Sequence, residues 1–196
     1  GEGEEPIKDF VEAVINNKNY DNIENLWVKK SNKVDENGNF IDVIKNPIRR
    51  LGDNLDLIPW PDRELYRKFH WFQKDKSYEL FLASRGCPFD CSYSFNHLFR
   101  DLYKGKAKGL RLRSPQDVVD EIKYVHEKHG IQNVMFIDST FNLNKRWVIE
   151  FCNLFAEQTD LPMTCNVRAD LMDDEIAQAL AAARCNPARF AIETGN

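Results

Sequence analysis

The chain has 196 residues, 42% of them hydrophobic, and a formal net charge of −4. This length allows one sizeable domain with an appendage. The mildly acidic balance argues against a general nucleic-acid binder, so no nucleic-acid partner is expected. No apolar run reaches about 18 residues, so neither a transmembrane helix nor a membrane partner is expected.

Five cysteines occur behind an acidic start, Gly-Glu-Gly-Glu-Glu, which has no apolar stretch after it to form a signal peptide. An odd number of cysteines without a signal predicts a reducing, cytoplasmic setting with thiols that are free or metal-bound. Both ends of the sequence are abrupt, and we expect the chain to be cut from a larger protein.

Residues 1–46 predict a helix and β-hairpin appendage. Pro6 suits the first helical turn, and apolar residues follow at helical spacing. Residues 26–28 and 40–43 resemble short strands, and Asn37-Gly38 between them favours a hairpin because both residues tolerate positive φ. Residues 47–76 are a linker rich in proline and aromatic residues, with a short helix expected near 63–69. We expect this linker to lie against the next domain.

From residue 77 the pattern alternates between strands and helices. Strands are predicted at 80–83, 134–138, 162–167 and 189–192, with a helix at 95–103 and further helices that begin after the caps Ser114, Asn144 and Asp173. Such repeats predict an α/β fold with a parallel sheet and right-handed crossovers. Four units form a partial (β/α) barrel, about half of a TIM-type barrel, over residues 77–196. The last strand is then an unpaired edge, so we expect pairing with another chain through it or marginal stability.

One stretch carries recognisable chemistry: Arg-Gly-Cys87-Pro-Phe-Asp-Cys91-Ser-Tyr93-Ser94-Phe. Two thiols lie four residues apart in a loop, and a serine follows three residues after the second. Thiolates at such spacing suit an iron–sulfur cluster. A zinc site at the two thiols is an alternative, although no second pair of ligands is evident.

This stretch resembles the cluster loop of the radical S-adenosylmethionine (radical SAM) family, whose pattern is Cys-x3-Cys-x-aromatic-Cys. Cys87, Cys91 and Tyr93 match the pattern, and Ser94 stands where the family has its third cysteine. The resemblance covers residues 77–196 well and 1–76 loosely. Residues 1–46 resemble the exit from a cobalamin-binding domain in one branch of the family, and an ordinary appendage is the alternative.

The resemblance implies a 4Fe-4S cluster held at Cys87, Cys91 and position 94, with S-adenosylmethionine at the iron that has no protein ligand. It also implies cobalamin in the full-length parent. Polar residues follow the predicted strands, and the carboxyl ends of parallel strands share the mouth in which ligands bind. Implied contacts with S-adenosylmethionine are made by Asp138, Ser139, Asn166, Arg168, Glu193 and Tyr93. The alternative for each is a structural ion pair or a helix cap.

Ser94 is the departure from the family pattern. A free cysteine has a pKa of about 8.5, whereas a serine hydroxyl is far harder to ionise and is a hard ligand for soft iron. Three explanations stay open: a replaced cysteine that abolishes the cluster, a weak oxygen ligand, or a degenerate homologue without radical chemistry. The intact surroundings favour a single replacement in a once-functional site.

The resemblance implies an enzyme that cleaves S-adenosylmethionine reductively to start radical chemistry, with cobalamin-dependent methyl transfer as one outcome and with impairment by Ser94. The alternative is a catalytically inactive half-barrel without a cluster that serves as a binding or assembly module. The substrate, a small molecule or a peptide, is not visible in the sequence. Of the other cysteines, Cys152 and Cys185 are expected to be inert, and Cys165 falls in a predicted strand.

Overall fold

The computed structural model describes residues 2–69 and 78–192; residues 1, 70–77 and 193–196 lie outside that description. The chain divides into two compact units. The first consists of residues 1–53 and 90–108, and the second of residues 54–89 and 109–196. The linker expected at 47–76 is therefore split after Asp53, and residues 90–108 join the N-terminal unit.

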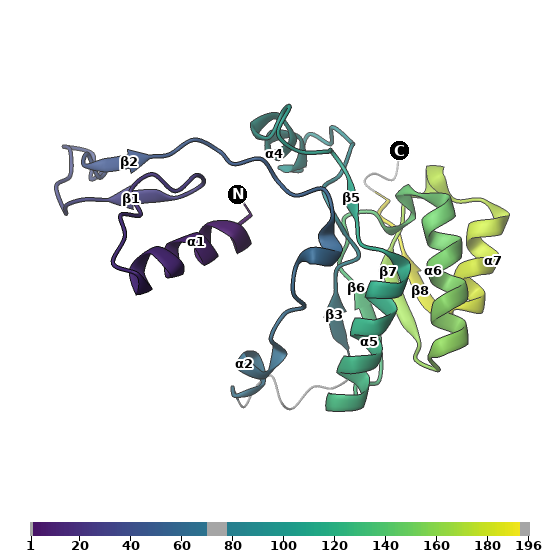
Figure 1. The fold of residues 1–196 in the computed structure, drawn as a ribbon. Helices are drawn as coiled ribbons and strands as arrows, with labels where there is room; N and C mark the ends of the chain where they lie inside the picture. The colour runs from purple at the N-terminus through teal and green to yellow at the C-terminus, as the bar shows by residue number, and fades with distance from the viewer. Residues whose placement is uncertain (1, 70–77, 193–196) are drawn as a thin grey trace. The chain divides into compact units, whose positions relative to one another are not determined.

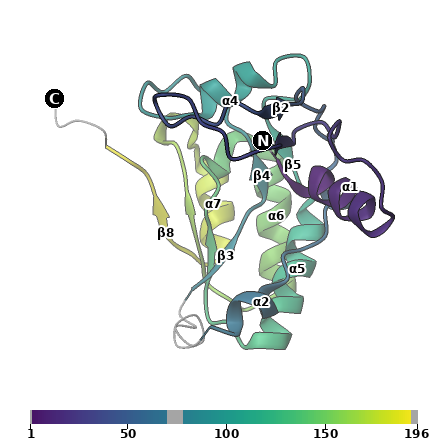
Figure 2. The same cartoon turned by 90° about the vertical axis from the view of Figure 1, so that its left-hand side faces the viewer.

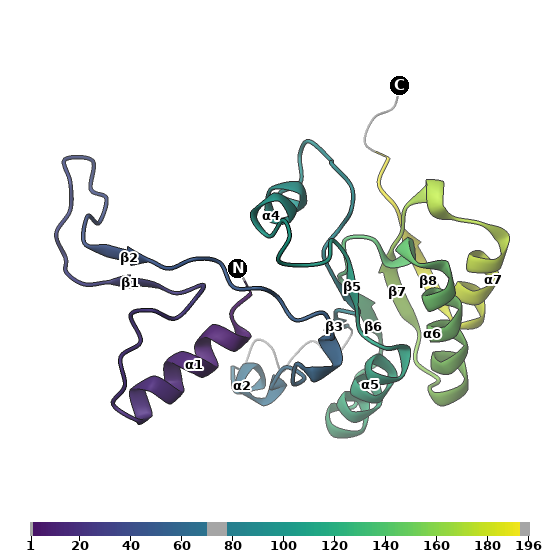
Figure 3. The ribbon, with the colours of Figure 1, turned by 45° about the horizontal axis from the view of Figure 1, so that its top comes forward.

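The first unit contains the predicted helix and hairpin (Figure 3). Helix α1 spans Glu4–Ile15, and strands β1 (Trp27–Lys29) and β2 (Val43–Lys45) pair antiparallel. Gly38 has a φ of 81°, as the predicted turn requires. The second strand was placed too early, because residue 40 makes only an isolated bridge with Val34.

The side chain of Asp35 stabilises the turn at the tip of the hairpin. Its carboxylate accepts hydrogen bonds from the backbone nitrogens of Asn37 and Asn39, at 2.9 and 2.8 Å. These two bonds lower the pKa of Asp35, with the contact to Asn39 as the largest cause. This turn occupies residues 35–39, and the chain bends at residues 41–42 before β2 begins at Val43.

Residues 90–108 of the same unit carry helix α4 (Asn96–Leu102). They are joined to the N-terminal segment by backbone pairing, since the nitrogen of Leu51 donates to the carbonyl of Lys106 at 3.0 Å. Tyr103, just after α4, is buried and packs on Phe99 with ring centroids 4.7 Å apart.

The second unit contains a four-stranded parallel sheet in the order β3-β6-β7-β8. Its strands span Glu79–Phe81, Val134–Phe136, Met163–Asn166 and Cys185–Arg189. Helices α5 (Pro115–His129), α6 (Lys145–Gln158) and α7 (Asp174–Ala182) lie together on one face of the sheet (Figures 1 and 2). The predicted α/β class with a parallel sheet is confirmed.

The predicted helix caps are confirmed. The side chains of Ser114, Asn144 and Asp173 accept hydrogen bonds from the backbone nitrogens of Asp117, Trp147 and Ile176. These caps satisfy amides that have no partner in the first turn of a helix. The core between the sheet and the helices includes completely buried side chains from every layer (Val118, Ile122, Phe136, Val148, Phe151, Phe155 and Cys165).

One strand prediction was wrong, and one pair of strands was not predicted. The last strand was expected at 189–192, but β8 occupies Cys185–Arg189 and includes Pro187. The apolar run after it was the stronger strand signal, whereas proline is disfavoured within strands. The structure also contains a short antiparallel pair that was not predicted, β4 (Ser84–Arg85) with β5 (Arg111–Leu112). The segment between α4 and Ser114 therefore contains a short strand.

Residues 54–67, part of the expected linker, belong to the second unit. They include the 3-10 turn η1 (Leu55–Leu57) and the short helix α2 (Arg63–Arg67). Arg63 donates to Glu121 of α5 at 2.6 Å, and Glu121, which is 1% exposed, also accepts a bond from Arg113. A buried carboxylate shared by two guanidinium groups thus holds this segment on α5. Among the described helices, none has the length and apolarity that crossing a membrane requires.

Candidate functional site

Asp138 follows β6 and is 1% exposed. Its carboxylate accepts hydrogen bonds from the backbone nitrogen of Ala83, at 3.1 and 3.2 Å, and from the hydroxyl of Ser84. Burial raises the pKa of this carboxyl, and the bonds from Ser84 and Ala83 oppose that effect. Asp138 therefore joins the end of β6 to the segment that enters the cysteine loop.

Asn166, at the end of β7, extends this network. Its side-chain amide donates to the backbone carbonyl of Asp138 at 3.1 Å. Two of the predicted site residues are thus brought together by hydrogen bonding at the carboxyl ends of neighbouring parallel strands. Ser139, which follows Asp138, is exposed at the same end.

Arg168 is held by a residue that the sequence analysis missed. Asn142, 2% exposed, accepts from the backbone nitrogen of Arg168 at 2.9 Å and donates to its carbonyl at 3.0 Å. The guanidinium of Arg168 makes two bonds to Asp170, at 2.9 and 2.7 Å, and lowers the pKa of that carboxyl. It also lies 3.8 Å over the ring of Phe89. The polar residues that follow β6 could have indicated Asn142 as a candidate. Its partner, the backbone of Arg168, could not be predicted because it depends on the tertiary fold.

The cysteine loop leaves β4 through a backbone position that requires glycine. Gly86 has a φ of 95°, and a Cβ added there would lie 2.2 Å from the carbonyl oxygen of Gly109. The pairing of β4 with β5 brings these two segments together. Cys87 follows directly and is 8% exposed. The fold therefore fixes the direction in which the loop begins.

The rest of the loop belongs to the first unit. The backbone nitrogen of Ser94 donates to the carbonyl of Cys91 at 3.0 Å, which closes a turn between the second and third positions of the Cys-x3-Cys-x-aromatic-Cys pattern. The Ser94 hydroxyl accepts from the backbone nitrogen of Asn96 at 3.3 Å, at the start of α4. Tyr93 is largely exposed. Glu193 lies outside the described residues, so its predicted role stays a prediction.

The donor set falls one thiol short of a cluster bound by three cysteines. Cys87 and Cys91 are free thiols, and position 94 offers a hydroxyl. Within the described parts of the chain, no group of three His, Cys, Asp or Glu side chains is placed to hold a metal ion. The residues present therefore do not match the ligand set of a cluster held by three thiolates.

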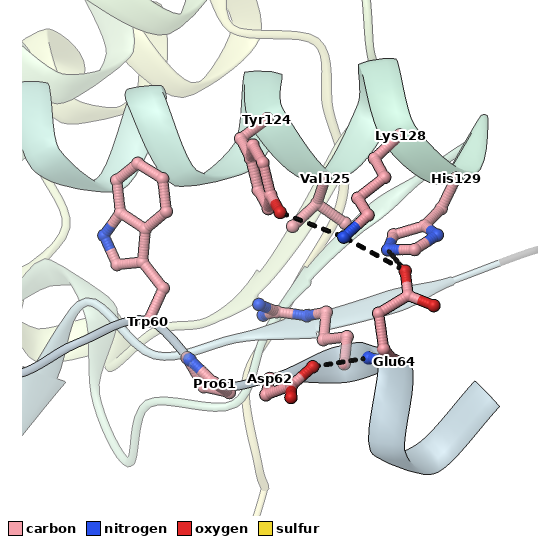
Figure 4. Close-up of a pocket in the computed structure, with 9 residues that line it drawn as sticks. Trp60, Pro61, Asp62, Glu64, Tyr124, Val125, Lys128 and His129 are labelled. Atoms are coloured by element: carbon pink, nitrogen blue, oxygen red, sulfur yellow. Dashed lines mark hydrogen bonds and ion pairs between the residues drawn. The ribbon is translucent and has the colours of Figure 1, made fainter. Parts of the chain in front are cut away.

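A cavity of about 330 Å³ lies elsewhere in the second unit (Figure 4). It is formed where the linker segment crosses α5, and Lys128 bonds to Tyr124 at 3.1 Å and to Glu64 at 3.2 Å within it. His129, the last residue of α5, lines its end. Because α5 leads back to the start of β6, this cavity lies away from the carboxyl ends of the strands.

Residues 81–196, more than half of the chain, match the Radical SAM superfamily. The chain belongs to this superfamily. It is 28% identical over its whole length to an uncharacterized methyltransferase of Pyrococcus horikoshii, of which it covers 40%. Over 76% of its length it is 27% identical to cytidylyl-2-hydroxyethylphosphonate methyltransferase of Streptomyces wedmorensis, of which it covers 29%. The chain thus spans less than half of these relatives.

The fold is also similar to that of TsrM from Kitasatospora setae, a radical S-adenosylmethionine methyltransferase. One TsrM structure, with tryptophan substrate and a SAM analogue bound, aligns with a TM-score of 0.69 and 18% identity over 98% of this chain and 36% of that chain. A second, with cobalamin and a [4Fe-4S] cluster bound, aligns with a TM-score of 0.66. At this identity the likeness concerns the fold.

Proposed function

We propose that this chain is part of a radical SAM methyltransferase-like protein and carries the first half of its barrel together with its cluster loop. The observation that carries the proposal is the Cys87-x3-Cys91-x-Tyr93 loop, which begins beside the polar carboxyl ends of the parallel strands in a chain of this superfamily. The four parallel strands with helices on one face support a partial barrel.

Cys87 and Cys91 are the proposed protein ligands of a 4Fe-4S cluster, and position 94 is the third. A cluster held there would supply the electron for reductive cleavage of S-adenosylmethionine. Ser94 offers a hydroxyl that accepts a hydrogen bond at the start of α4. Because this donor is hard and difficult to ionise, we propose that it weakens cluster binding and impairs the activity.

The strand ends supply groups for the polar parts of S-adenosylmethionine. Arg168 is the proposed partner of the carboxylate, because a guanidinium binds a carboxylate through two bonds. Asn166 and Ser139 are proposed contacts at the same edge, with Tyr93 near the adenine and Glu193 at the ribose. Direct contact of Asp138 with the amino group stays a prediction, since its carboxylate already accepts bonds from Ala83 and Ser84.

Cobalamin-dependent methyl transfer is the proposed outcome in the full-length protein. The methyltransferase relatives and the fold shared with TsrM, whose structure contains cobalamin, support it. The alternative is a binding or assembly module without a cluster. The donor set that falls one thiol short favours this alternative for the chain as it stands. Pairing with another chain through the sheet edge remains part of either proposal.

Binding of S-adenosylmethionine distinguishes the two functions. Equilibrium dialysis with labelled S-adenosylmethionine should show binding to Ser94→Cys protein after anaerobic reconstitution with iron and sulfide, and much weaker binding before it. Arg168→Ala in the same background should lose this binding, whereas Arg189→Ala, on the edge strand, should retain it. Equal binding with and without reconstitution, or none in either state, would overturn the enzyme proposal in favour of the module.

A further inference from the structure

Two cysteines outside the cluster loop lie side by side in the sheet. The sulfurs of Cys165 in β7 and Cys185 in β8 are 3.7 Å apart and share a hydrogen bond. Both thiols are free, and neither takes part in the proposed function. Cys185 was predicted to be inert because it falls just after a predicted helix, and the 20-residue separation of the two cysteines gave no sign of their contact.

The pairing of β7 with β8 brings the two cysteines to the same side of the sheet. Met163 pairs with Cys185 and Cys165 pairs with Ala188, so β8 has one more residue than β7 between the two pairs. Because Cys185 pairs directly with Met163, two residues before Cys165, both cysteines lie on the side of the sheet that faces the helical layer, and the bulge in β8 comes after Cys185. Thr164, on the opposite side of β7, donates to the carbonyl of Pro187 at 2.6 Å and holds the bulge in place.

The two thiols differ in their access to solvent. Cys165 is completely buried in the core, whereas Cys185 is partly exposed on β8, an outer strand of the described sheet. The hydrogen bond from Cys165 lowers the pKa of Cys185, and the same bond together with burial raises the pKa of Cys165. An oxidant thus meets Cys185 first, and the thiolate form of Cys185 is the more stable of the two.

We propose that Cys165 and Cys185 are a redox pair that closes to a disulfide on exposure to a hydroperoxide. The Cys185 thiolate attacks the peroxide, which converts hydrogen peroxide to hydroxide and Cys185 to a sulfenic acid. The sulfur of Cys165 then attacks that sulfenic sulfur, loses its proton and releases water. In total two thiols lose two electrons and two protons, and the peroxide becomes two waters. A thiol reductant reverses the reaction.

The disulfide would tie β8 to β7. Asn166, next to Cys165 in β7, belongs to the network at the strand ends, so oxidation would cross-link the sheet beside the candidate site. Cys152 of α6 is the natural comparison, because it is equally buried and its pKa is raised to about 12 by burial. Cys185 also contributes to this rise, so Cys152 lies near the pair, and the Cys152→Ser variant shows whether it takes part.

Peptide mapping after oxidation tests the pair. The protein is treated with hydrogen peroxide in the native state, alkylated, digested without reductant and analysed by mass spectrometry. The expected result is a cross-linked Cys165–Cys185 peptide, loss of both thiols from the alkylated pool, and recovery of both with dithiothreitol. Cys152→Ser should give the same cross-link, and Cys165→Ser should leave Cys185 as a sulfenic acid that dimedone traps.

The proposal is overturned if alkylation after the peroxide treatment still labels both Cys165 and Cys185. It is also overturned if Cys87 and Cys91 form the disulfide while this pair stays reduced. The wild-type mapping alone decides this, even if the Cys165→Ser variant fails to fold. The outcome is independent of iron and S-adenosylmethionine, so it does not depend on the proposed function.

Discussion

The guanidinium of Arg168 lies 3.8 Å over the ring of Phe89. Phe89 stands between Cys87 and Cys91, and Arg168 follows the end of β7. The cysteine loop is therefore packed against the segment that follows β7 by a cation–π contact. Arg168, which was predicted to contact S-adenosylmethionine, therefore also contacts the cysteine loop.

Removing the ring of Phe89 should loosen the loop around Cys87. In Phe89→Ala, alkylation of Cys87 by iodoacetamide, followed residue by residue with mass spectrometry, should be about two- to five-fold faster, as loss of a contact of about 0.5–1 kcal/mol implies. Phe95→Ala is the matched control, because that ring is 71% exposed. An unchanged rate at Cys87 in Phe89→Ala would show that the contact does not hold the loop.

The shared carboxylate of Glu121 should be a major source of stability in the second unit. Glu121→Ala leaves Arg63 and Arg113 without their buried partner, so the free energy of unfolding should fall by about 3 kcal/mol. Urea unfolding at neutral pH measures it. Glu127→Ala, on an exposed position of the same helix, should change it by less than about 0.5 kcal/mol. Equal effects of the two substitutions would show that the ion pairs of Glu121 do not stabilise the second unit.

Gly86→Ala should be destabilising because the new Cβ would collide with the carbonyl of Gly109 and because φ there is 95°. The expected loss is about 1–3 kcal/mol in urea unfolding. Gly52→Ala serves as the control, since a Cβ at that position meets nothing within 4 Å and its φ is not in the left-handed region. A Gly86→Ala protein as stable as the Gly52→Ala protein would contradict the close approach.

The buried carboxyl of Asp138 should give a stability difference that depends on pH. Burial raises its folded pKa above the ordinary value of 3.8, so the folded state resists deprotonation. Relative to Asp138→Asn, the wild type should therefore lose stability as the pH rises from 3.8 through the folded pKa, and the difference should level off above it.

Urea unfolding of both proteins over this range of pH checks the sign. Asp170→Asn should behave in the opposite way, because Arg168 lowers the pKa of Asp170 and its contribution is lost as the pH falls. The wild type could instead gain stability relative to Asp138→Asn as the pH rises. That result would show that the bonds from Ser84 and Ala83 outweigh burial.

Local signals in the sequence predicted much of the fold. Ser114, Asn144 and Asp173 cap their helices because capping depends on a side chain and an amide two or three residues away. The parallel sheet followed from the strand–helix repeat. Strand β8 was misplaced because a bulge and the packing of its start against β7, rather than apolar content, set its position.

The site was predictable only where its residues follow strands or carry a motif. Asp138, Asn166 and Arg168 lie at strand ends as expected, but their partners come from distant segments. The pairing of Asp138 with Ser84 and of Arg168 with Asn142 depends on which strands are neighbours, and no local pattern contains that information. The same limitation hid the contact between Cys165 and Cys185.

The most direct test of the account is iron uptake by position-specific cysteine variants. Wild type, Ser94→Cys and Ser92→Cys are reconstituted anaerobically with iron and sulfide, and the retained iron and the visible absorbance of each are measured. Both variants carry one added thiol in the same loop, so only its position differs. Ser94→Cys should retain a four-iron cluster and turn brown, whereas the wild type and Ser92→Cys should not. If Ser94→Cys retains no more iron than Ser92→Cys, the loop is not built to bind a cluster.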